Sequence, residues 1–378
     1  MTIFDTAATG EIQEAAAEVV QRVIVPLAAS VPPGGKLTAE QMRQALRALR
    51  PLGYLGSTLP KDLGGAGHSY VQYGILLEAL ARGPVLFGEV VPPRTINYLG
   101  TEEQKRRWLP KLLSGDWIST AAITEPQAGS DMRGFRTTAV LEGDHYVVNG
   151  RKRWLKLGST ADLMTLMVVD PAGGGLSRLV VERETSPWEA HDIETVGLKT
   201  ISLAEITFDG TRVPRENILG QAGAGGEQFH RGIEASRAFI GIQAVGIAGH
   251  ALDRAIAYAK DRTAFGRPIA KFQAIQIALA DAATRLQAAR LLCLNALAIL
   301  DSGRRAPRDV SMAKVFAVDT ALAVAQTAME SMGAQGTAAE AEVERCWRDA
   351  AMLSAIDGTG GINRLIIGRE TLGMPAFL

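Results

Sequence analysis

A carboxylate near the C-terminus is the first residue whose surroundings could support catalysis. Asp357 lies in the sequence AIDGTGG, residues 355–361, directly before an apolar run that begins at Ile362. Taken alone, an aspartate in this context is most simply the N-cap of a helix. Burial away from water would instead raise its pKa from about 4 toward the neutral range and make it a general base. The local residues leave both interpretations open.

A glycine-containing turn offers a second chemical feature. Residues 123–131 read ITEPQAGSD and combine backbone N–H groups with the hydroxyls of Thr124 and Ser130. Such a turn can cradle a phosphate or hydrogen-bond a flat heterocycle. An ordinary turn capped by Ser and Asp has the same composition. Trp154, in the sequence NGRKRW, likewise has two interpretations: a core aromatic, which is the simpler one, or a ring that packs on a ligand.

The elements that must position these residues fall into three regions. We predict an all-α domain over 1–118, a β domain over 119–218 and a helical bundle over 219–378, and therefore an α+β fold. In the first region, apolar residues at helical spacing run from Ile12 to Val23 and are followed by Pro26. Thr38 with Gln41 reads as a capping box that opens a second helix. Further helices are expected over 70–81 and 102–113.

The middle and last regions differ in periodicity. Short strands are expected over 137–141 and 146–148, joined as a hairpin, and then over 163–169, 179–182 and 205–208. Long Ala-rich helices follow over 227–259, 273–300 and 310–332. Because these helices are apolar on more than one face, they belong in a bundle or a subunit interface.

Composition narrows the class of protein. Lys plus Arg and Asp plus Glu are 40 each, so no global charge favours nucleic acid or an anionic membrane. The two cysteines, Cys293 and Cys346, lack a metal-ligand or disulfide pattern and read as buried thiols in a reducing cytosol. The N-terminus lacks a signal-peptide pattern. No stretch approaches the roughly 20 uninterrupted apolar residues of a membrane helix. We expect a cytoplasmic enzyme without membrane insertion or a metal site.

The turn at 123–131 closely resembles the TEPxAGSD signature of the acyl-CoA dehydrogenases. The resemblance implies that Thr124 hydrogen-bonds the ring of FAD, and that Ser130 lies near the flavin pyrophosphate and the thioester. Ile123 and Gly129 belong to the same cofactor-binding turn. Residues 149–154 resemble the NGxKxW strand of the family, in which the tryptophan packs on the flavin. That role falls on Trp154.

Other motifs follow in the family's order, so the resemblance covers roughly residues 10–372. It implies an N-terminal helical domain, a middle β-barrel-like domain and a C-terminal four-helix bundle. Residues 262–273 resemble a turn that reaches the FAD of a neighbouring subunit. Residues 330–336 stand where a second intersubunit FAD contact is found. The cofactor contacts assigned in this way are Arg262, Phe265, Gln273, Glu330, Gly333 and Thr359.

The C-terminal turn resembles the family's RDA…YEGT signature, with Asp357 where the catalytic glutamate is expected. The resemblance makes Asp357 the base that removes the substrate α proton and adds Arg237 and Gly358 to Ser130 as substrate contacts. The N–H of Asp357 is the expected donor to the thioester carbonyl. Some relatives place the base where this chain has Ser236, which cannot serve. Glu234 lies about 200° around the same helix and is expected to point elsewhere.

The resemblance implies FAD-dependent α,β-dehydrogenation of an acyl thioester, either acyl-CoA or an acyl-carrier protein. A homotetramer built as a dimer of dimers and an electron-transfer flavoprotein as acceptor are the implied partners. Two alternatives stay open. Nitroalkane oxidases resemble the family and use Asp at this position, with an Arg seven residues on, as in Asp357 and Arg364. The chain could also be a weakly active subunit of a hetero-oligomeric acyl-CoA dehydrogenase.

Several positions depart from the family pattern. Lys156 replaces a Thr or Ser near flavin N5, and either stabilises a reduced anionic flavin or points to solvent. Glu330 would repel a pyrophosphate unless it is paired. Gly361 removes a side chain that often contacts the adenosine. Aspartate withdraws the base by roughly 1.5 Å, a single carbon–carbon step. We therefore expect an unusual, closely held acyl group instead of a straight fatty acyl chain.

The acyl pocket itself is weakly defined by the sequence. Three polar residues near loops, His68, Glu89 and Arg94, can line it, although a surface position is the simpler expectation for each.

Overall fold

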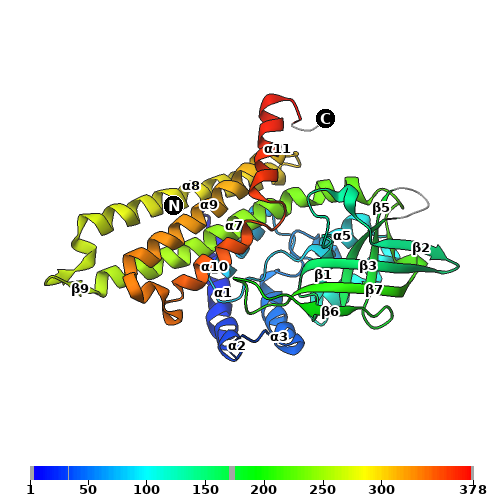
Figure 1. Ribbon diagram of the computed structural model, residues 1–378, viewed down its shortest axis with the longest axis horizontal. Coiled ribbons are helices and arrows are strands. Elements are labelled where there is room, and N and C mark those ends of the chain that lie inside the picture. Colours follow the sequence, from blue (N-terminus) through cyan, green and yellow to red (C-terminus); the bar gives the residue numbers. More distant parts are fainter. Residues whose placement is uncertain (1–3, 33, 170–174, 376–378) are drawn as a thin grey trace.

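The computed structural model describes residues 4–32, 34–169 and 175–375, and it places the N-terminal helices and a β-sheet against a long helical bundle (Figure 1). The first helix, α1 (Ala7–Val19), continues through a π-helical turn (Val20–Ile24) into α2 (Val25–Ala29). Pro26, which should have ended the helix, lies in its continuation. Proline is tolerated there because it falls in the first turn of α2, where the backbone N–H that it lacks is not needed.

Capping boxes start the next helices where the sequence predicted them. Thr38 with Gln41 opens α3 (Ala39–Leu49), Ser69 with Gln72 opens α4 (Tyr70–Leu80), and Thr101 with Gln104 opens α6 (Glu102–Ser114). An unpredicted helix, α5 (Val91–Leu99), starts with Pro92 and Pro93. Proline in the first helical turn is tolerated because its missing N–H has no helical partner there.

The middle region forms a mixed sheet of eight strands in the order β6-β7-β3-β2-β4-β5-β8, with β1 parallel to β4. The long pair β3–β7 carries register shifts between Lys152 and Leu155, next to Trp154. Such irregularities re-aim a side chain out of the regular pleat. The strands are β1 (Ser119–Ala122), β2 (Thr138–Glu142), β3 (His145–Lys156), β4 (Leu163–Val169), β5 (Leu176–Glu182), β6 (Glu189–Asp192), β7 (Leu203–Pro214) and β8 (Ile218–Leu219).

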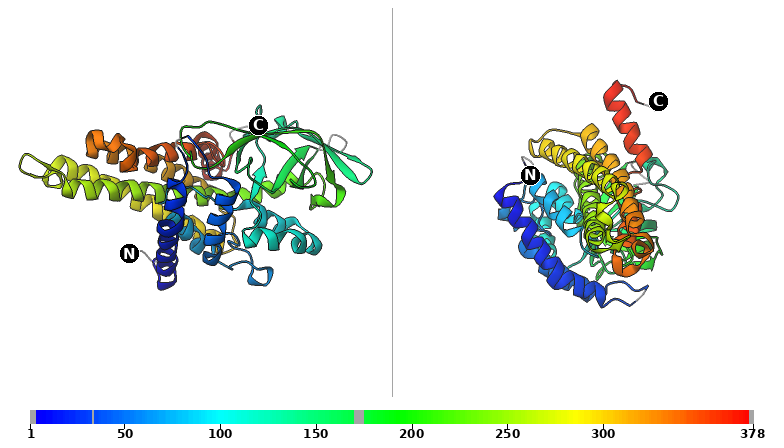
Figure 2. Two further views of the ribbon diagram at one scale, coloured as in Figure 1. Left: turned by 90° about the horizontal axis from the view of Figure 1, so that it is seen from below. Right: turned by 90° about the vertical axis from the view of Figure 1, so that its left-hand side faces the viewer.

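The C-terminal region is built on three long helices, α7 (Gly225–Asp261), α8 (Gln273–Asp301) and α9 (Pro307–Met332), which pack along one another. A two-stranded ribbon, β9 (Thr263–Ala264) and β10 (Arg267–Pro268), joins α7 to α8 at the end of the bundle far from the sheet (Figure 1). The shorter α10 (Val343–Leu353) packs on α7 and α9, and α11 (Gly360–Leu372) projects from the bundle (Figure 2).

Short 3-10 turns complete the connections, at Arg50–Leu52, Lys61–Leu63, Met132–Gly134, Arg215–Asn217, Ile269–Lys271, Gly333–Thr337 and Ala339–Ala341. The described part of the chain thus has the α+β architecture that the sequence predicted.

Helix α8 is, among the described residues, the one helix long and apolar enough to cross a membrane by length and composition alone. It packs against α4, α7 and α9 and leaves Ile277, Leu291 and Leu292 exposed. A bundle helix with an apolar outer face for a second subunit would also be this long and this apolar.

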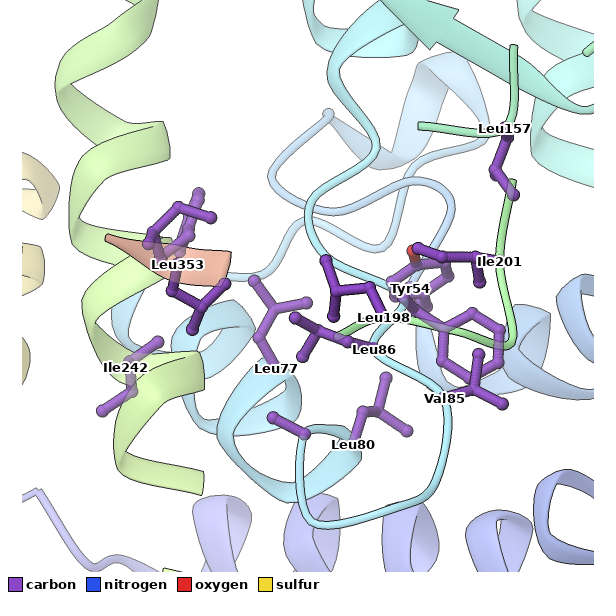
Figure 3. Close-up of a cluster of buried hydrophobic side chains, with 14 of the residues drawn as sticks. Tyr54, Leu77, Leu80, Val85, Leu86, Leu157, Leu198, Ile201, Ile242 and Leu353 are labelled. Carbon is purple, nitrogen blue, oxygen red and sulfur yellow. The ribbon is translucent and has the colours of Figure 1, made fainter. Parts of the chain in front are cut away.

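One hydrophobic core joins the three regions. Figure 3 shows Leu77, Leu80, Val85 and Leu86 of the N-terminal region packed toward side chains of the other two. The partners labelled there are Leu157, Leu198 and Ile201 from the β region and Ile242 and Leu353 from the bundle. Leu86 and Leu157, which are the chain neighbours of Phe87 and Lys156, therefore belong to the same core.

Candidate active site

A buried ion pair holds the turn at 123–131. Glu125 accepts the N–H groups of Arg136 (2.7 Å) and Thr137 (3.0 Å) and the ammonium of Lys152 (2.8 Å). Lys152 also donates to the Ile123 carbonyl (2.8 Å) and has no solvent exposure. Burial lowers the pKa of Lys152 to about 8, and Glu125 opposes that shift. The pair fixes the turn from within, while Gly129 and Ser130 stay exposed and Thr124 partly so.

Trp154 lies beside this turn with its indole in solvent. The N–H of Arg153 donates to the Thr124 carbonyl (2.8 Å), which brings the end of β3 against the turn. Trp154 has a φ of 70° and is 49% exposed, so the interpretation as a core aromatic is wrong. A half-exposed ring on a strand that is hydrogen-bonded to the turn at 123–131 can stack on a flat heterocycle.

The Asp357 turn is held by three side chains. Arg237 on α7 donates to the Asp357 carbonyl (3.2 Å), and Asn363 on α11 donates to the carbonyls of Gly358 (2.9 Å) and Thr359 (3.0 Å). Lys314 on α9 also donates to the Gly358 carbonyl. Asp357 adopts a φ of 53°, a left-handed conformation that an ordinary side chain rarely takes. The turn is therefore fixed from α7, α9 and α11 together.

The N-cap of α11 is Thr359, not Asp357. The Thr359 hydroxyl accepts the N–H of Ile362 (3.3 Å). The simplest local interpretation of Asp357 is therefore wrong, because the carboxylate is not used by the helix. Thr359 had been assigned to the cofactor, and here its hydroxyl caps the helix.

The surroundings of Asp357 shift its proton affinity upward. Burial raises the pKa of the Asp357 carboxyl, and the nearby Glu89 raises it further. Lys314, Arg237 and Arg94 act in the opposite direction. The carboxylate is consequently a better proton acceptor than an aspartate in water. Burial lowers the pKa of Lys314 to about 8.

The Lys156 ammonium is directed inward. Its Nζ donates to the carbonyls of Phe87 and Glu89, the latter at 3.2 Å, so of the two alternatives the one in which it points to solvent is wrong. Burial lowers the pKa of Lys156 to about 8, and Glu89 and Asp357 oppose the shift. A cavity of about 20 Å³ lined by Tyr54, Glu89 and Lys156 has room for about one water. Lys156 therefore joins the electrostatic environment of Asp357.

Glu89 and Arg94 form a buried network with Ser236, where surface positions were expected. The Glu89 and Arg94 side chains are 6% and 16% exposed and pair at 2.7 Å. Arg94 donates to the Gly232 carbonyl and to the Ser236 hydroxyl, both at 3.0 Å, and Ser236 donates to Glu89 (2.6 Å). These hydrogen bonds hold both side chains against α7, which carries Gly232 and Ser236. His68 lies elsewhere and contacts the Leu52 carbonyl (2.9 Å).

One sequence feature could have revealed this network. Glu89 and Arg94 are opposite charges that flank the apolar run Val90 to Pro93, and charged residues near an apolar run are buried only when they are paired. Glu234 points away from the network, as predicted, since it pairs with Arg305 and accepts the Ala306 N–H (3.0 Å).

The remaining cofactor assignments lie at the far end of the bundle. Arg262 and Phe265 stand on the β9–β10 ribbon, and Gln273 begins α8 (Figure 1). Glu330 and Gly333 end α9, where Glu330 accepts a hydrogen bond from Gln326 (2.7 Å). The fold does not bring these residues to Trp154 or Asp357 of the same chain. Phe265 is 95% exposed, as expected of a residue that serves a neighbouring subunit.

Comparison with known proteins places this arrangement in a family. Models of the N-terminal, middle and C-terminal domains of acyl-CoA dehydrogenase match residues 6–116, 120–211 and 223–372. An acyl-CoA dehydrogenase of Bacillus subtilis (strain 168) is 37% identical over 340 residues, 87% of this chain and 90% of that protein.

Solved structures agree with the sequence matches. The acyl-CoA dehydrogenase of Geobacillus kaustophilus superposes with a TM-score of 0.92 at 30% identity and covers 98% of this chain and 100% of its own. A glutaryl-CoA dehydrogenase of Mycobacterium smegmatis in complex with FADH2 superposes with a TM-score of 0.88 at 25% identity, over 99% of this chain and 97% of its own.

The fold and these matches define a flavin-dependent oxidoreductase. The chain belongs to the acyl-CoA dehydrogenase family. It is an oxidoreductase that acts on the CH–CH group of an acyl-CoA, and its cofactor is FAD.

Proposed function

We propose that this enzyme oxidises the Cα–Cβ bond of an acyl thioester with Asp357 as the base. The observation that carries the proposal is the Asp357 turn itself. Its carboxylate is not spent on capping α11, its backbone is held by Arg237, Lys314 and Asn363, and burial raises its pKa. A carboxylate with these properties is suited to removing the weakly acidic α proton.

The cofactor is proposed to lie between the turn at 123–131 and Trp154. Thr124 would hydrogen-bond the flavin ring, Ile123, Gly129 and Ser130 would line it, and the indole of Trp154 would stack on it. Bound FAD supplies the acceptor for the hydride that leaves the β carbon. In this proposal Ser130, Arg237 and Gly358 border the thioester, and the Asp357 N–H donates to its carbonyl and acidifies the α proton.

Anaerobic flavin reduction tests the role of Asp357. The purified FAD-bound protein is mixed with short acyl-CoA esters, and bleaching of the flavin is followed by stopped-flow absorbance. Asp357→Asn is expected to slow bleaching by roughly 10²- to 10⁴-fold, the usual contribution of a general base, while ligand binding persists. Asp357→Glu moves the carboxylate by roughly 1.5 Å and is expected to lose about a hundredfold. Bleaching of Asp357→Asn at the wild-type rate would remove Asp357 from the mechanism.

The same assay separates the alternatives. If nitroethane reduces the flavin and peroxide forms in air, while acyl-CoA does not reduce the flavin, the oxidase is favoured. The observation that supports this alternative is the aspartate at position 357. Protein that takes up no FAD would favour a weakly active subunit of a hetero-oligomer.

We further propose a cytoplasmic homotetramer that passes electrons to an electron-transfer flavoprotein. Support for assembly comes from the exposed Phe265 and from the apolar Ile277, Leu291 and Leu292 left uncovered on α8. The two cysteines are free and buried, which suits a reducing compartment. Size-exclusion chromatography with light scattering measures the assembly, and reduction of a purified electron-transfer flavoprotein measures the transfer.

A further inference from the structure

Gln243 on α7 carries a buried polar atom that the protein leaves unsatisfied. Its side chain is 1% exposed, and its Nε2 donates to the Phe239 carbonyl (2.9 Å). That bond fixes the amide orientation, because a carbonyl accepts only from the nitrogen. The Oε1 atom then has no hydrogen-bond partner among the described residues. An acceptor buried in this state costs free energy unless a ligand or water donates to it.

The unsatisfied oxygen and the Lys156 ammonium both lie close to Gly88. A Cβ placed on Gly88 would stand 2.9 Å from Lys156 Nζ and 3.7 Å from Gln243 Oε1, so both atoms border the same small space. Gly88 has a φ of 68°, which favours glycine, and a side chain there would crowd Lys156 Nζ. An ammonium has three donors, and the carbonyls of Phe87 and Glu89 take two of them. One donor of Lys156 and one acceptor of Gln243 are therefore left without a protein partner close to Gly88 among the described residues.

This space belongs to the surroundings of the catalytic base. Lys156 donates to the Glu89 carbonyl and Ser236 to the Glu89 side chain, while the next residue, Arg237, donates to the Asp357 carbonyl. Gly88, Lys156 and Asp357 all keep some solvent exposure. Gln243 follows Ser236 by seven residues, nearly two turns, so both lie on the α7 face that packs against residues 87–90. This side of the site thus presents hydrogen-bonding groups where a hydrocarbon chain would need aliphatic ones.

We propose that Lys156 Nζ and Gln243 Oε1 form a subsite for a hydroxyl group on the acyl chain, an inference that rests on the acyl-thioester function proposed above. A hydroxyl accepts from the ammonium and donates to the amide oxygen, so it satisfies both groups at once.

Other chemical groups suit the subsite less well. A carboxylate near Lys156 would also meet the oxygens of Gln243, Phe87 and Glu89, all of which repel it. An ammonium would be repelled by Lys156. A methyl group would leave both the donor and the acceptor unsatisfied.

Three CoA esters that differ at one position test the subsite. The terminal group is a hydroxyl in 4-hydroxybutyryl-CoA, a methyl in pentanoyl-CoA and a carboxylate in succinyl-CoA. Dissociation constants are measured by calorimetry on FAD-bound Asp357→Asn, which separates binding from turnover. We expect 4-hydroxybutyryl-CoA to bind about tenfold more tightly than pentanoyl-CoA, the effect of about one hydrogen bond to a charged group.

The preference should depend on both side chains. In Gln243→Leu and in Lys156→Met, combined with Asp357→Asn, the ratio of the two dissociation constants is expected to fall toward one. Thr165→Val is the matched control, because Thr165 on β4 is buried with an equally unpartnered hydroxyl and should keep the tenfold ratio. Because both dissociation constants are measured on the same variant, a loss of folded protein affects both and cancels in their ratio.

Two results overturn the subsite. In one, pentanoyl-CoA binds as tightly as the hydroxy ester. In the other, succinyl-CoA binds most tightly of the three esters. Persistence of the preference in both variants overturns it as well. Flavin bleaching in the wild-type protein tests the underlying function separately. If pentanoyl-CoA bleaches the flavin but the hydroxy ester has no advantage, only the subsite fails. If no ester bleaches the flavin while the binding ratio holds, the dehydrogenase proposal fails and the subsite stands.

Discussion

At the scale of single residues, the role of Asp357 is decided by its neighbour Thr359. Since Thr359 caps α11, the Asp357 carboxylate faces the charges of Glu89, Lys314, Arg237 and Arg94 instead of a helix end. These groups oppose one another, so the proton affinity of Asp357 depends on their balance.

The pH dependence of catalysis tests that balance. The rate is expected to rise as Asp357 loses its proton, at a pH above the usual aspartate range because burial raises its pKa. Lys314 lowers that pKa, so Lys314→Met should move the acid limb of kcat/KM to higher pH. Lys314→Arg keeps the charge and should leave the limb near its wild-type position. The measurement is kcat/KM for an acyl-CoA with an artificial acceptor across the acid and neutral range. An unmoved limb in Lys314→Met would contradict the electrostatic role.

At the scale of elements, buried side chains fix the two turns that make the site. Glu125 and Lys152 join the turn at 123–131 to β3, and Asn363 joins the Asp357 turn to α11. Both turns therefore depend on side chains that are buried within the protein.

The Glu125–Lys152 pair can be tested by unfolding. Lys152→Met leaves Glu125 buried and unpaired, which is expected to cost about 3–5 kcal/mol in the free energy of unfolding. Adding Glu125→Gln should recover part of the loss, because the amide keeps an acceptor for Arg136 and Thr137 without a buried charge. Urea denaturation followed by circular dichroism measures both variants.

An exposed ion pair gives the control for that experiment. Glu18 on α1 and Arg22 on the π-helical turn that follows it pair at 2.7 Å, with both side chains largely in solvent. Arg22→Met should change stability by less than about 1 kcal/mol. A similar loss for Lys152→Met and Arg22→Met would show that burial adds nothing.

Helix capping at Thr359 is expected to couple stability to catalysis. Thr359→Ala and Thr6→Ala each remove an N-cap, at α11 and at α1, and each should cost about 1 kcal/mol. Only Thr359→Ala should also slow flavin reduction, because Thr359 borders the Asp357 turn. Thermal unfolding and stopped-flow bleaching are compared for the two variants. Equal rates in both would mean that the cap does not position the base.

At the scale of the whole molecule, the site of one chain is incomplete if Arg262, Phe265 and Gln273 serve FAD. They lie on the far end of the bundle from Trp154, so only another subunit can bring them there (Figure 1). If these residues serve FAD, the enzyme needs the predicted assembly in order to be active.

Mixed oligomers test that requirement. Arg262→Glu and Asp357→Asn should each be inactive alone. When the two are co-expressed, a mixed dimer has one site with an intact base from one chain and an intact arginine from the other. Random pairing should restore about a quarter of the wild-type activity, since the contact is reciprocal in a symmetric dimer. Activity in the mixture no greater than in the separate variants would place Arg262 outside the partner's site.

Much of the fold was predictable because it rests on local signals. The capping boxes at Thr38, Ser69 and Thr101 and the apolar periodicity of α7, α8 and α9 are properties of short stretches of sequence. Helix α5 was missed because its prolines resemble a loop, and the passage through Pro26 depends on its place in the first turn of α2. The domain boundaries at 118 and 218 and the site assignments stay predictions.

The sequence by itself determined the family, the cofactor and the position of the Asp357 carboxylate, because these depend on motifs of consecutive residues. Only the tertiary structure decided that Asp357 does not cap α11, that Lys156 turns inward, and that Glu89, Arg94 and Ser236 form one buried network. The physical reason is that Lys156 and Ser236 meet partners more than 60 residues away in the chain, at Phe87 and Glu89, and that the choice between Asp357 and Thr359 as the cap depends on how the turn is packed. Burial and charge at such contacts are set by packing, which no local pattern records.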